Sequence, residues 1–304
     1  MPDRRVAAAA LVLGLCLLAG CGAPAAVHDP LPALDTPGIL APLSTPAATP
    51  AGYTPLPLYL DGLLCAKAYE RDGCAFLPVR AFCNAFALDM SQSADAEGFL
   101  LRIGTLAVHG TGALPYYTAG GRYIWAPDGW LWYGGELYLP MDACAKLFTI
   151  GIEREDDRVS ASGAGMRVLS GGGDYYELNF PSDDVYWLSH IINAEAMGEP
   201  LEGQIGVGNV VLNRMNSPLF PNSVYEVIYD TQHTIQFEPI ALGGIKENPS
   251  EQAVIAAYLC LEGANTVGDS LYFANPAYGS WWFDTYLQPV VSIGHHNFYK
   301  DKDQ

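Results

Sequence analysis

Glu195 is the residue best placed to do chemistry, because it is a carboxylate on an otherwise apolar helical face. A helix is predicted over residues 186–198, since Leu188, Ile191 and Ile192 recur at helical spacing and Glu195 continues their face. Burial disfavours the charged form of a carboxyl group, and the negative end of the helix dipole acts in the same direction. Glu195 is therefore a candidate general acid that keeps its proton near neutral pH. The alternative is a buried structural glutamate paired with a cation.

The helix that carries Glu195 has clear boundaries. Residues 182–184 supply a capping serine and two first-turn aspartates, and Gly198 supplies the stop. Glu199 and Glu202 come after this stop, at the start of a second predicted helix over residues 201–214. We expect both to be exposed acids that favour the helix start. Of these three carboxylates, Glu195 alone is then expected to have a buried setting.

A third helix is predicted further along the chain. Asn248 is its expected cap, Pro249 its first residue and Gly263 its stop. Its small-residue face is expected to lie in the core and consists of Ala253, Ala256, Ala257 and Cys260. A core position for Cys260 argues against a thiol nucleophile.

The composition limits the class of protein. With 304 residues, half of them hydrophobic, two folded domains are expected. The net charge of −18 would repel a polyanion, which excludes nucleic acid as a partner. His295 and His296 are adjacent, but neighbours on a strand point to opposite faces and chelate poorly. We therefore expect no metal and no cofactor.

The first 20 residues predict a targeting segment. Two arginines precede the apolar run of residues 6–18, which is too short for an ordinary membrane span. The run ends in Leu18-Ala19-Gly20-Cys21, which resembles the lipobox of bacterial lipoproteins. This resemblance implies removal of residues 1–20 and lipidation of the Cys21 thiol. The protein would then be exported and attached by its lipid to the outer face of the cytoplasmic membrane, within the cell wall. A plain secretory signal with an incidental cysteine is the alternative.

A linker and a first domain follow. Residues 21–56 are rich in proline, which favours extended polyproline II. In residues 57–170, the segment 74–86 is echoed by the segment 136–148, and each copy predicts a strand, a Leu-Pro step and a short helix. This pattern resembles the copper amine oxidase N-terminal-like stalk domain of bacterial surface proteins. The resemblance implies a smaller β-rich domain with two related halves, which could contact the wall or another protein.

Two features of this first domain have more than one interpretation. Copper is not expected, because His109 is the only histidine of the domain and no ligand set accompanies it. Three tryptophans are interpreted as core residues, with a sugar-stacking patch as the alternative: Trp125, Trp130 and Trp132. A run of three glycines at residues 171–173 then marks the boundary to a domain over residues 174–304, which we expect to fold independently.

The last domain carries a series of short motifs. They are Ala194-Glu195-Ala196, Gly198-Glu199-Pro200, Glu202-Gly203-Gln204, Val210-Val211-Leu212-Asn213-Arg214, Gln236-Phe237, Leu271-Tyr272-Phe273, Asn275-Pro276-Ala277 and Ile293-Gly294-His295. Together they resemble the SleB/CwlJ-type cell wall hydrolases, known from spore cortex-lytic enzymes. The resemblance implies an α+β, lysozyme-like catalytic domain that cleaves peptidoglycan glycan strands between N-acetylmuramic acid and N-acetylglucosamine. It also implies that Glu195 is the catalytic acid.

Two departures from the family pattern stand out. Met197 occupies a position where members usually carry a basic residue, which would weaken substrate contact. Gly206 and Gly208 stand where alanines are commoner; they lower helix propensity but let another helix approach closely. We expect these glycines to affect stability only.

The remaining candidate residues would bind the glycan. Aromatic rings stack on the C–H faces of sugars, and amide or imidazole groups bond acetamido and hydroxyl groups. The candidates are Gln236, Phe237, Tyr272, Asn275, Tyr278, Trp281, Trp282 and His295. For Trp281 and Trp282, the alternative is that they close the core.

The expected function is a lytic transglycosylase or muramidase-like enzyme, with two rivals. A non-enzymatic wall-binding lipoprotein could keep the fold, and an amidase could cut the peptide stem. Retention of Glu195 in its buried helical setting argues against the binding module.

Overall fold

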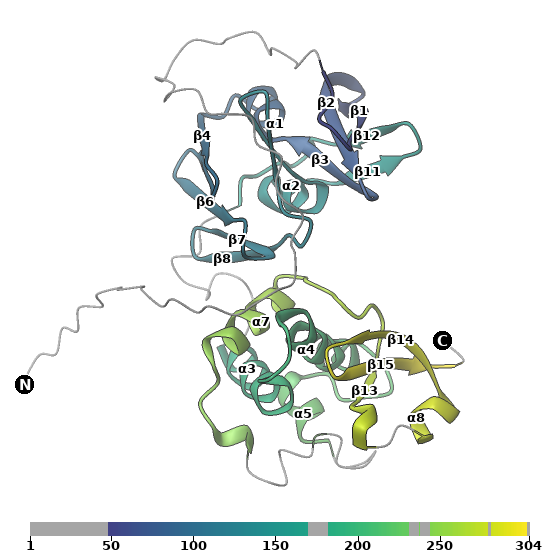
Figure 1. The fold of residues 1–304 in the computed structure, drawn as a ribbon. Helices are drawn as coiled ribbons and strands as arrows, with labels where there is room; N and C mark the ends of the chain where they lie inside the picture. The colour runs from purple at the N-terminus through teal and green to yellow at the C-terminus, as the bar shows by residue number, and fades with distance from the viewer. Residues whose placement is uncertain (1–47, 170–181, 231–236, 238–243, 279–280, 303–304) are drawn as a thin grey trace, which may run out of the picture.

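The computed structural model describes residues 48–169, 182–230, 237, 244–278 and 281–302 (Figure 1). The predicted signal segment with Cys21, most of the linker, and Gln236 lie outside these residues. Within the described residues, no helix combines the length and the apolar character needed to cross a membrane.

The first domain contains two sheets and two short helices. A seven-stranded sheet has the order β11-β12-β1-β2-β3-β10-β9, and a five-stranded antiparallel sheet has the order β4-β5-β6-β7-β8. The strands are β1 Thr54–Leu60, β2 Leu63–Arg71, β3 Cys74–Pro78, β4 Met90–Ala94, β5 Gly98–Ile103, β6 Leu106–Thr111, β7 Tyr116–Ala119, β8 Arg122–Trp125, β9 Leu131–Tyr133, β10 Glu136–Pro140, β11 Ile152–Glu155 and β12 Arg158–Ala161. The helices are α1 Val79–Ala85 and α2 Met141–Phe148.

The two copies of the sequence echo form the same local unit. β3 leads into α1 and β10 leads into α2; the two strands pair antiparallel with Leu77 opposite Leu139. Phe82 stacks on Phe148 with ring centroids 5.1 Å apart, which joins the helices. The surrounding strands differ between the copies, so the description of the whole domain as two related halves remains a prediction.

The core of the first domain lies between the sheets and the helices. Trp130 and Trp132 are buried in it, which agrees with their interpretation as core residues. Trp125 is partly buried and packs instead against the core of the second domain. The five cysteines of the described residues are free thiols: Cys65, Cys74, Cys83, Cys144 and Cys260.

The second domain is a mixture of helices and a small sheet. Its elements are α3 Ser182–Ala196, α4 Leu201–Met215, α5 Val224–Ile228, η2 Gly244–Lys246, α7 Glu251–Leu261, β13 Tyr272–Ala274, η3 Pro276–Tyr278, α8 Trp281–Tyr286, β14 Leu287–Ile293 and β15 His296–Asp301. The sheet has the order β13-β15-β14 and is antiparallel throughout. The observed architecture of the chain is therefore of mixed α and β type, with the helices α3, α4 and α7 packed together (Figure 1).

Helix α4 is buried on almost every side, and two glycines make this possible. A Cβ atom at Gly208 would lie 2.6 Å from Cys260 Sγ and 2.9 Å from Ile192 Cδ1. A Cβ atom at Gly206 would lie 2.7 Å from Cζ of Phe298. Real side chains do not approach this closely, so the glycines allow α3, α7 and β15 to pack directly on α4.

The start of α7 differs from the sequence prediction. Its cap is Ser250, whose hydroxyl oxygen accepts a hydrogen bond from Ala253 N at 3.2 Å, and not Asn248. Ser250 N also donates to Asn193 Oδ1 of α3 at 2.9 Å, a long-range bond that fixes where α7 begins. The helix ends as predicted, because Gly263 follows it with a φ of +96°.

The two domains meet at the C-terminal end of α7, which we call the domain junction. Arg122 of β8 donates from Nε and Nη2 to the two carboxylate oxygens of Glu262, each at 2.7 Å. Lys146 Nζ lies 2.5 Å from Glu262 Oε2. The ring of Tyr123 also stacks on that of Tyr258, with the ring centroids 5.9 Å apart. Figure 1 shows β8 facing α7 across this contact. The domains are thus joined by a buried ionic contact and by Tyr116, Tyr123 and Trp125 of the first domain, which pack against the second core.

Candidate active site

Glu195 lies in the last turn of α3, where the sequence places it. Leu188, Ile191 and Ile192 are fully buried, and Glu195 follows them as a half-buried residue. Its Oε1 atom is inaccessible to solvent. The helix thus holds this carboxylate against the core with only part of the group exposed, as a proton donor requires.

Glu199 corrects the expectation of an exposed acid. Its side chain is only 9% exposed and both carboxylate oxygens bind His295. The backbone N–H of His295 donates to Oε2 at 2.8 Å, and His295 Nδ1 lies 3.0 Å from Oε1. The partners are 96 residues apart in sequence, so the helix-start pattern around Glu199 contained no signal for the contact.

Strand register brings further residues to the same end of the small sheet. Ala274 of β13 pairs with Asn297 of β15, and Ile293 of β14 pairs with His296. Asn275, the next residue after β13, therefore lies near the hairpin turn that carries His295. Asn275 Oδ1 accepts a hydrogen bond from Ala277 N at 3.0 Å, so its side chain also shapes the turn after β13.

His295 and His296 face different environments. His295 is 76% exposed, whereas His296 is buried with its ring 5.2 Å from that of Phe273. Burial lowers the pKa of His296. The two imidazoles do not converge, and the described residues contain no group of three or more His, Cys, Asp or Glu side chains arranged to hold a metal ion.

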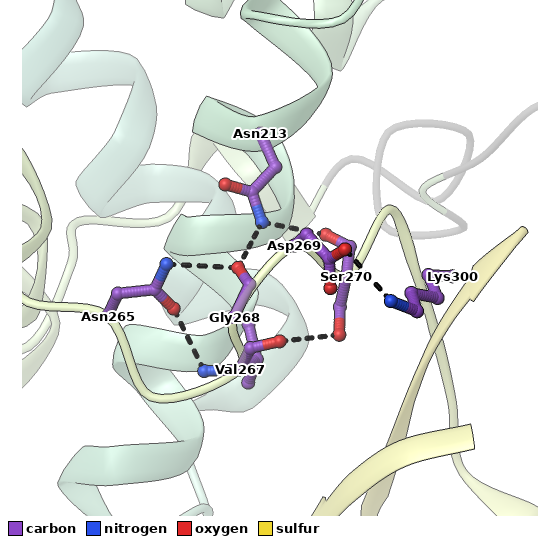
Figure 2. Close-up of polar contacts among 7 residues, drawn as sticks. All are labelled: Asn213, Asn265, Val267, Gly268, Asp269, Ser270 and Lys300. Atoms are coloured by element: carbon purple, nitrogen blue, oxygen red, sulfur yellow. Dashed lines mark hydrogen bonds and ion pairs between the residues drawn. The ribbon is translucent and has the colours of Figure 1, made fainter. Parts of the chain in front are cut away.

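Amides of α4 hold the loop that leads into the small sheet. Asn213 Nδ2 donates to the carbonyl oxygens of Gly268 and Ser270 at 2.8 and 2.9 Å, as Figure 2 shows. Within the loop, Asn265 donates from Nδ2 to the carbonyl oxygen of Gly268 and accepts at Oδ1 from Val267 N. The hydroxyl of Ser270 donates to the carbonyl oxygen of Val267. Lys300 forms an ion pair with Asp269 at 3.0 Å. Asn209 adds bonds to Ala264 and Thr266. The asparagine in the motif Val210-Val211-Leu212-Asn213-Arg214 thus positions the loop that leads into β13.

Arg214, at the end of the same motif, is buried among aromatic rings. Its Nε donates to the carbonyl oxygen of Leu271 at 2.7 Å, and its guanidinium carbon lies 5.0, 5.4 and 5.5 Å from the ring centroids of Phe220, Phe237 and Tyr272. Burial lowers the pKa of Arg214 to about 10. Phe237 is fully buried here. This places Phe237 in the core and not on a sugar-facing surface, because no part of its ring is accessible.

The other aromatic candidates have different settings. Trp281 and Trp282 of α8 are 72% and 50% exposed, so they do not close the core. Helix α8 is held to β15 by Phe283, whose ring lies 5.4 Å from that of Tyr299. Tyr272 is partly buried beside Arg214. Tyr278 ends the short helix η3. The side chain of Tyr278 and the whole of Gln236 lie outside the described parts of the chain.

The C-terminal part of this chain is similar in sequence to known proteins. A family model described as Cell Wall Hydrolase matches residues 198–299. The spore cortex-lytic enzyme of Bacillus subtilis (strain 168) is 40% identical over 126 residues, which are 39% of this chain and 38% of that protein. The spore cortex-lytic enzyme of Oceanobacillus iheyensis is 35% identical over 156 residues, covering 49% of this chain and 55% of that protein.

A solved structure is also similar. The catalytic domain of the germination-specific lytic transglycosylase SleB from Bacillus anthracis is 33% identical, with 40% of this chain and 98% of that domain covered and a TM-score of 0.37. The C-terminal part of this chain belongs to the cell wall hydrolase family. More narrowly, its identity to the two spore cortex-lytic enzymes makes it a domain of the SleB type. The chain spans about half or less of the length of the two curated relatives.

Proposed function

We propose that this protein is a peptidoglycan-lytic enzyme that cleaves the glycan strand between N-acetylmuramic acid and N-acetylglucosamine, with Glu195 as general acid and base. The observation that carries the proposal is the half-buried Glu195 at the end of α3, with one carboxylate oxygen enclosed, in a domain of the SleB type. A lysozyme-like fold for this domain is part of the proposal.

One carboxyl group can perform the whole reaction. Glu195 gives its proton to the glycosidic oxygen as the bond from the muramic C1 to that oxygen breaks. The muramic C6 hydroxyl then forms a bond to C1 and returns its proton to Glu195, so a 1,6-anhydro ring forms without water. This differs from glycosidases that need two carboxylates. Glu199, the next acid in sequence, has both oxygens on His295 and is not placed to act as a second nucleophile.

The test replaces Glu195 by glutamine in the full chain. Glu195→Gln keeps nearly the same side-chain volume but cannot donate or take back the catalytic proton, so release of soluble fragments from purified peptidoglycan should fall by about 10² to 10⁴-fold or more. Glu202→Gln in the first turn of α4 is the matched control and should retain activity. Unchanged activity in Glu195→Gln would exclude the mechanism.

Mass spectrometry of the products separates the remaining alternatives. Fragments ending in 1,6-anhydro muramic acid support the intramolecular route. Reducing ends would show hydrolysis, and free stem peptides would show an amidase. Binding to the wall without any fragment release would indicate the non-enzymatic module.

We also propose that the protein is attached to the membrane by lipid on Cys21, on the strength of the Leu18-Ala19-Gly20-Cys21 motif. The intact mass of the protein from its native host should show cleavage before Cys21 and added acyl chains. Cys21→Ser should lack the acyl mass. A wild-type protein without lipid mass would refute the attachment.

A further inference from the structure

The contact between Glu199 and His295 has features of a site that presents a side chain to a ligand. The carboxylate is nearly enclosed, at 9% exposure, while the imidazole that it binds is 76% exposed. Here the structure fixes one nitrogen of the ring and leaves the rest of the ring outside.

Several neighbouring residues are adapted to this contact. Gly294 has a φ of +57°, and a Cβ atom there would lie 1.9 Å from Glu199 Oε2. Any side chain at position 294 would therefore displace the carboxylate. Gln204 is fully buried and its Nε2 donates to the carbonyl oxygen of Glu199 at 3.1 Å, which fixes the backbone of the acid. The fold thus fixes the backbone of Glu199 and allows its carboxylate to lie against residue 294.

The geometry also determines which ring nitrogen of His295 carries the proton. An ionised carboxylate only accepts hydrogen bonds, so at 3.0 Å from Glu199 Oε1 the Nδ1 atom must be the donor. In the neutral ring Nε2 then has a lone pair and accepts hydrogen bonds. His295 therefore offers an acceptor of fixed direction at the surface.

Glu199, which holds this acceptor, follows closely after the helix that carries Glu195. Glu199 N donates to the carbonyl oxygen of Ala196 at 2.9 Å, which closes a tight turn directly after the end of α3. In such a turn the first and fourth Cα atoms are within about 7 Å of each other. The exposed ring of His295 is thus held by Glu199, which follows Glu195 by a single turn of the chain.

We propose that His295 binds the glycan through Nε2, accepting a hydrogen bond from a sugar hydroxyl or acetamido N–H, and that Glu199 is a positioning residue that holds His295 in this tautomer. The proposal rests on the proposed function, since it takes the ligand to be the glycan strand. It assigns Glu199 an indirect role, distinct from that of Glu195.

The kinetic test uses Glu199→Gln, His295→Ala and the double variant in the full chain, with Glu202→Gln as matched control. Loss of one hydrogen bond that is equal in the bound and transition states should raise the apparent KM about tenfold and leave kcat nearly unchanged. The double variant should resemble His295→Ala alone, because Glu199 acts through His295. Additive losses, or a loss in kcat alone, would overturn the positioning role.

A spectroscopic test follows the ring itself. In ¹⁵N-histidine-labelled protein at a pH where the ring is neutral, His295 should carry its proton on Nδ1. The Glu199→Gln amide can donate to Nδ1, which should move the proton of His295 to Nε2. The His295→Ala spectrum identifies the resonances. A wild-type ring protonated on Nε2 would overturn the proposal.

Binding is measured apart from catalysis. Soluble glycan fragments added to the Glu195→Gln variant should shift the Nε2 resonance of His295, and no shift at saturating ligand would overturn the proposed contact. If wild-type protein releases no fragments from peptidoglycan, the proposed function fails, while the tautomer of His295 still tests the role of Glu199 independently.

Discussion

Glu262 at the domain junction and Glu199 beside the proposed active site are both enclosed carboxylates, but their partners differ. Glu262 is 2% exposed, and its partners Arg122 and Lys146 are themselves largely buried, at 11% and 29%. Glu199 is similarly enclosed, yet its partner His295 is 76% exposed. We infer that the burial of an acid does not by itself indicate its role. The exposure of the group that it holds is more informative.

Loss of Glu262 and loss of Glu199 should therefore have different consequences. Without the carboxylate of Glu262, two cations would remain at a closed interface without compensation, which costs stability. Without that of Glu199, an exposed ring would only lose its orientation.

Glu262→Ala should strongly destabilise the protein. Breaking a buried ion pair costs about 3–5 kcal/mol, and we expect the lower end because Lys146 can reach solvent. For a chain of this size, this corresponds to a melting temperature lower by roughly 6–12 °C. Asp269→Ala is the control, because Asp269 forms an exposed pair with Lys300 that should contribute less than about 1 kcal/mol. Equal shifts in the two variants would contradict the distinction.

The junction should also make stability depend on pH. Burial alone would raise the pKa of Glu262, but hydrogen bonds and charge from Arg122 and Lys146 outweigh it and hold the pKa below its ordinary value of 4.5. Because the folded-state pKa is the lower one, the stabilisation is present above pH 4.5 and is lost as the pH falls through the folded-state value. Melting curves should show a steeper acid decline in wild type than in Glu262→Gln; parallel declines would argue against this assignment.

Two glycines of similar backbone conformation test the contact between Glu199 and His295. Gly294 and Gly268 have φ values of +57° and +59°, so alanine at either should cost about 1–2 kcal/mol. A Cβ atom at 294 collides with Glu199, whereas one at 268 meets nothing within 4 Å. Gly294→Ala should therefore also raise the apparent KM about tenfold, as Glu199→Gln does, and Gly268→Ala should not. Identical kinetics in the two variants would weaken the link between Gly294 and the site.

Local sequence patterns predicted the elements well where the contacts are local. The spacing of Leu188, Ile191 and Ile192 placed Glu195 on the correct helix and face. The small residues at Gly206 and Gly208 predicted a close helix approach, and the structure shows it.

The errors arose where a partner lies far away in the chain. Glu199 was expected to be exposed because its partner His295 comes 96 residues later, and no periodicity connects the two. The start of α7 was misplaced because Ser250 is fixed by Asn193 of another helix. The Arg122–Glu262 pair, 140 residues apart, was not predicted for the same reason.

The junction has a further consequence for how the protein unfolds. Lys146 of the first domain donates to the backbone carbonyl oxygen of Glu262 as well as to its carboxylate. A cation from one domain thus neutralises the negative end of helix α7 in the other. Melting of the first domain would remove this charge from the end of α7. The unfolding of the two domains is thereby thermodynamically coupled, and calorimetry should show a single cooperative heat-absorption peak for both.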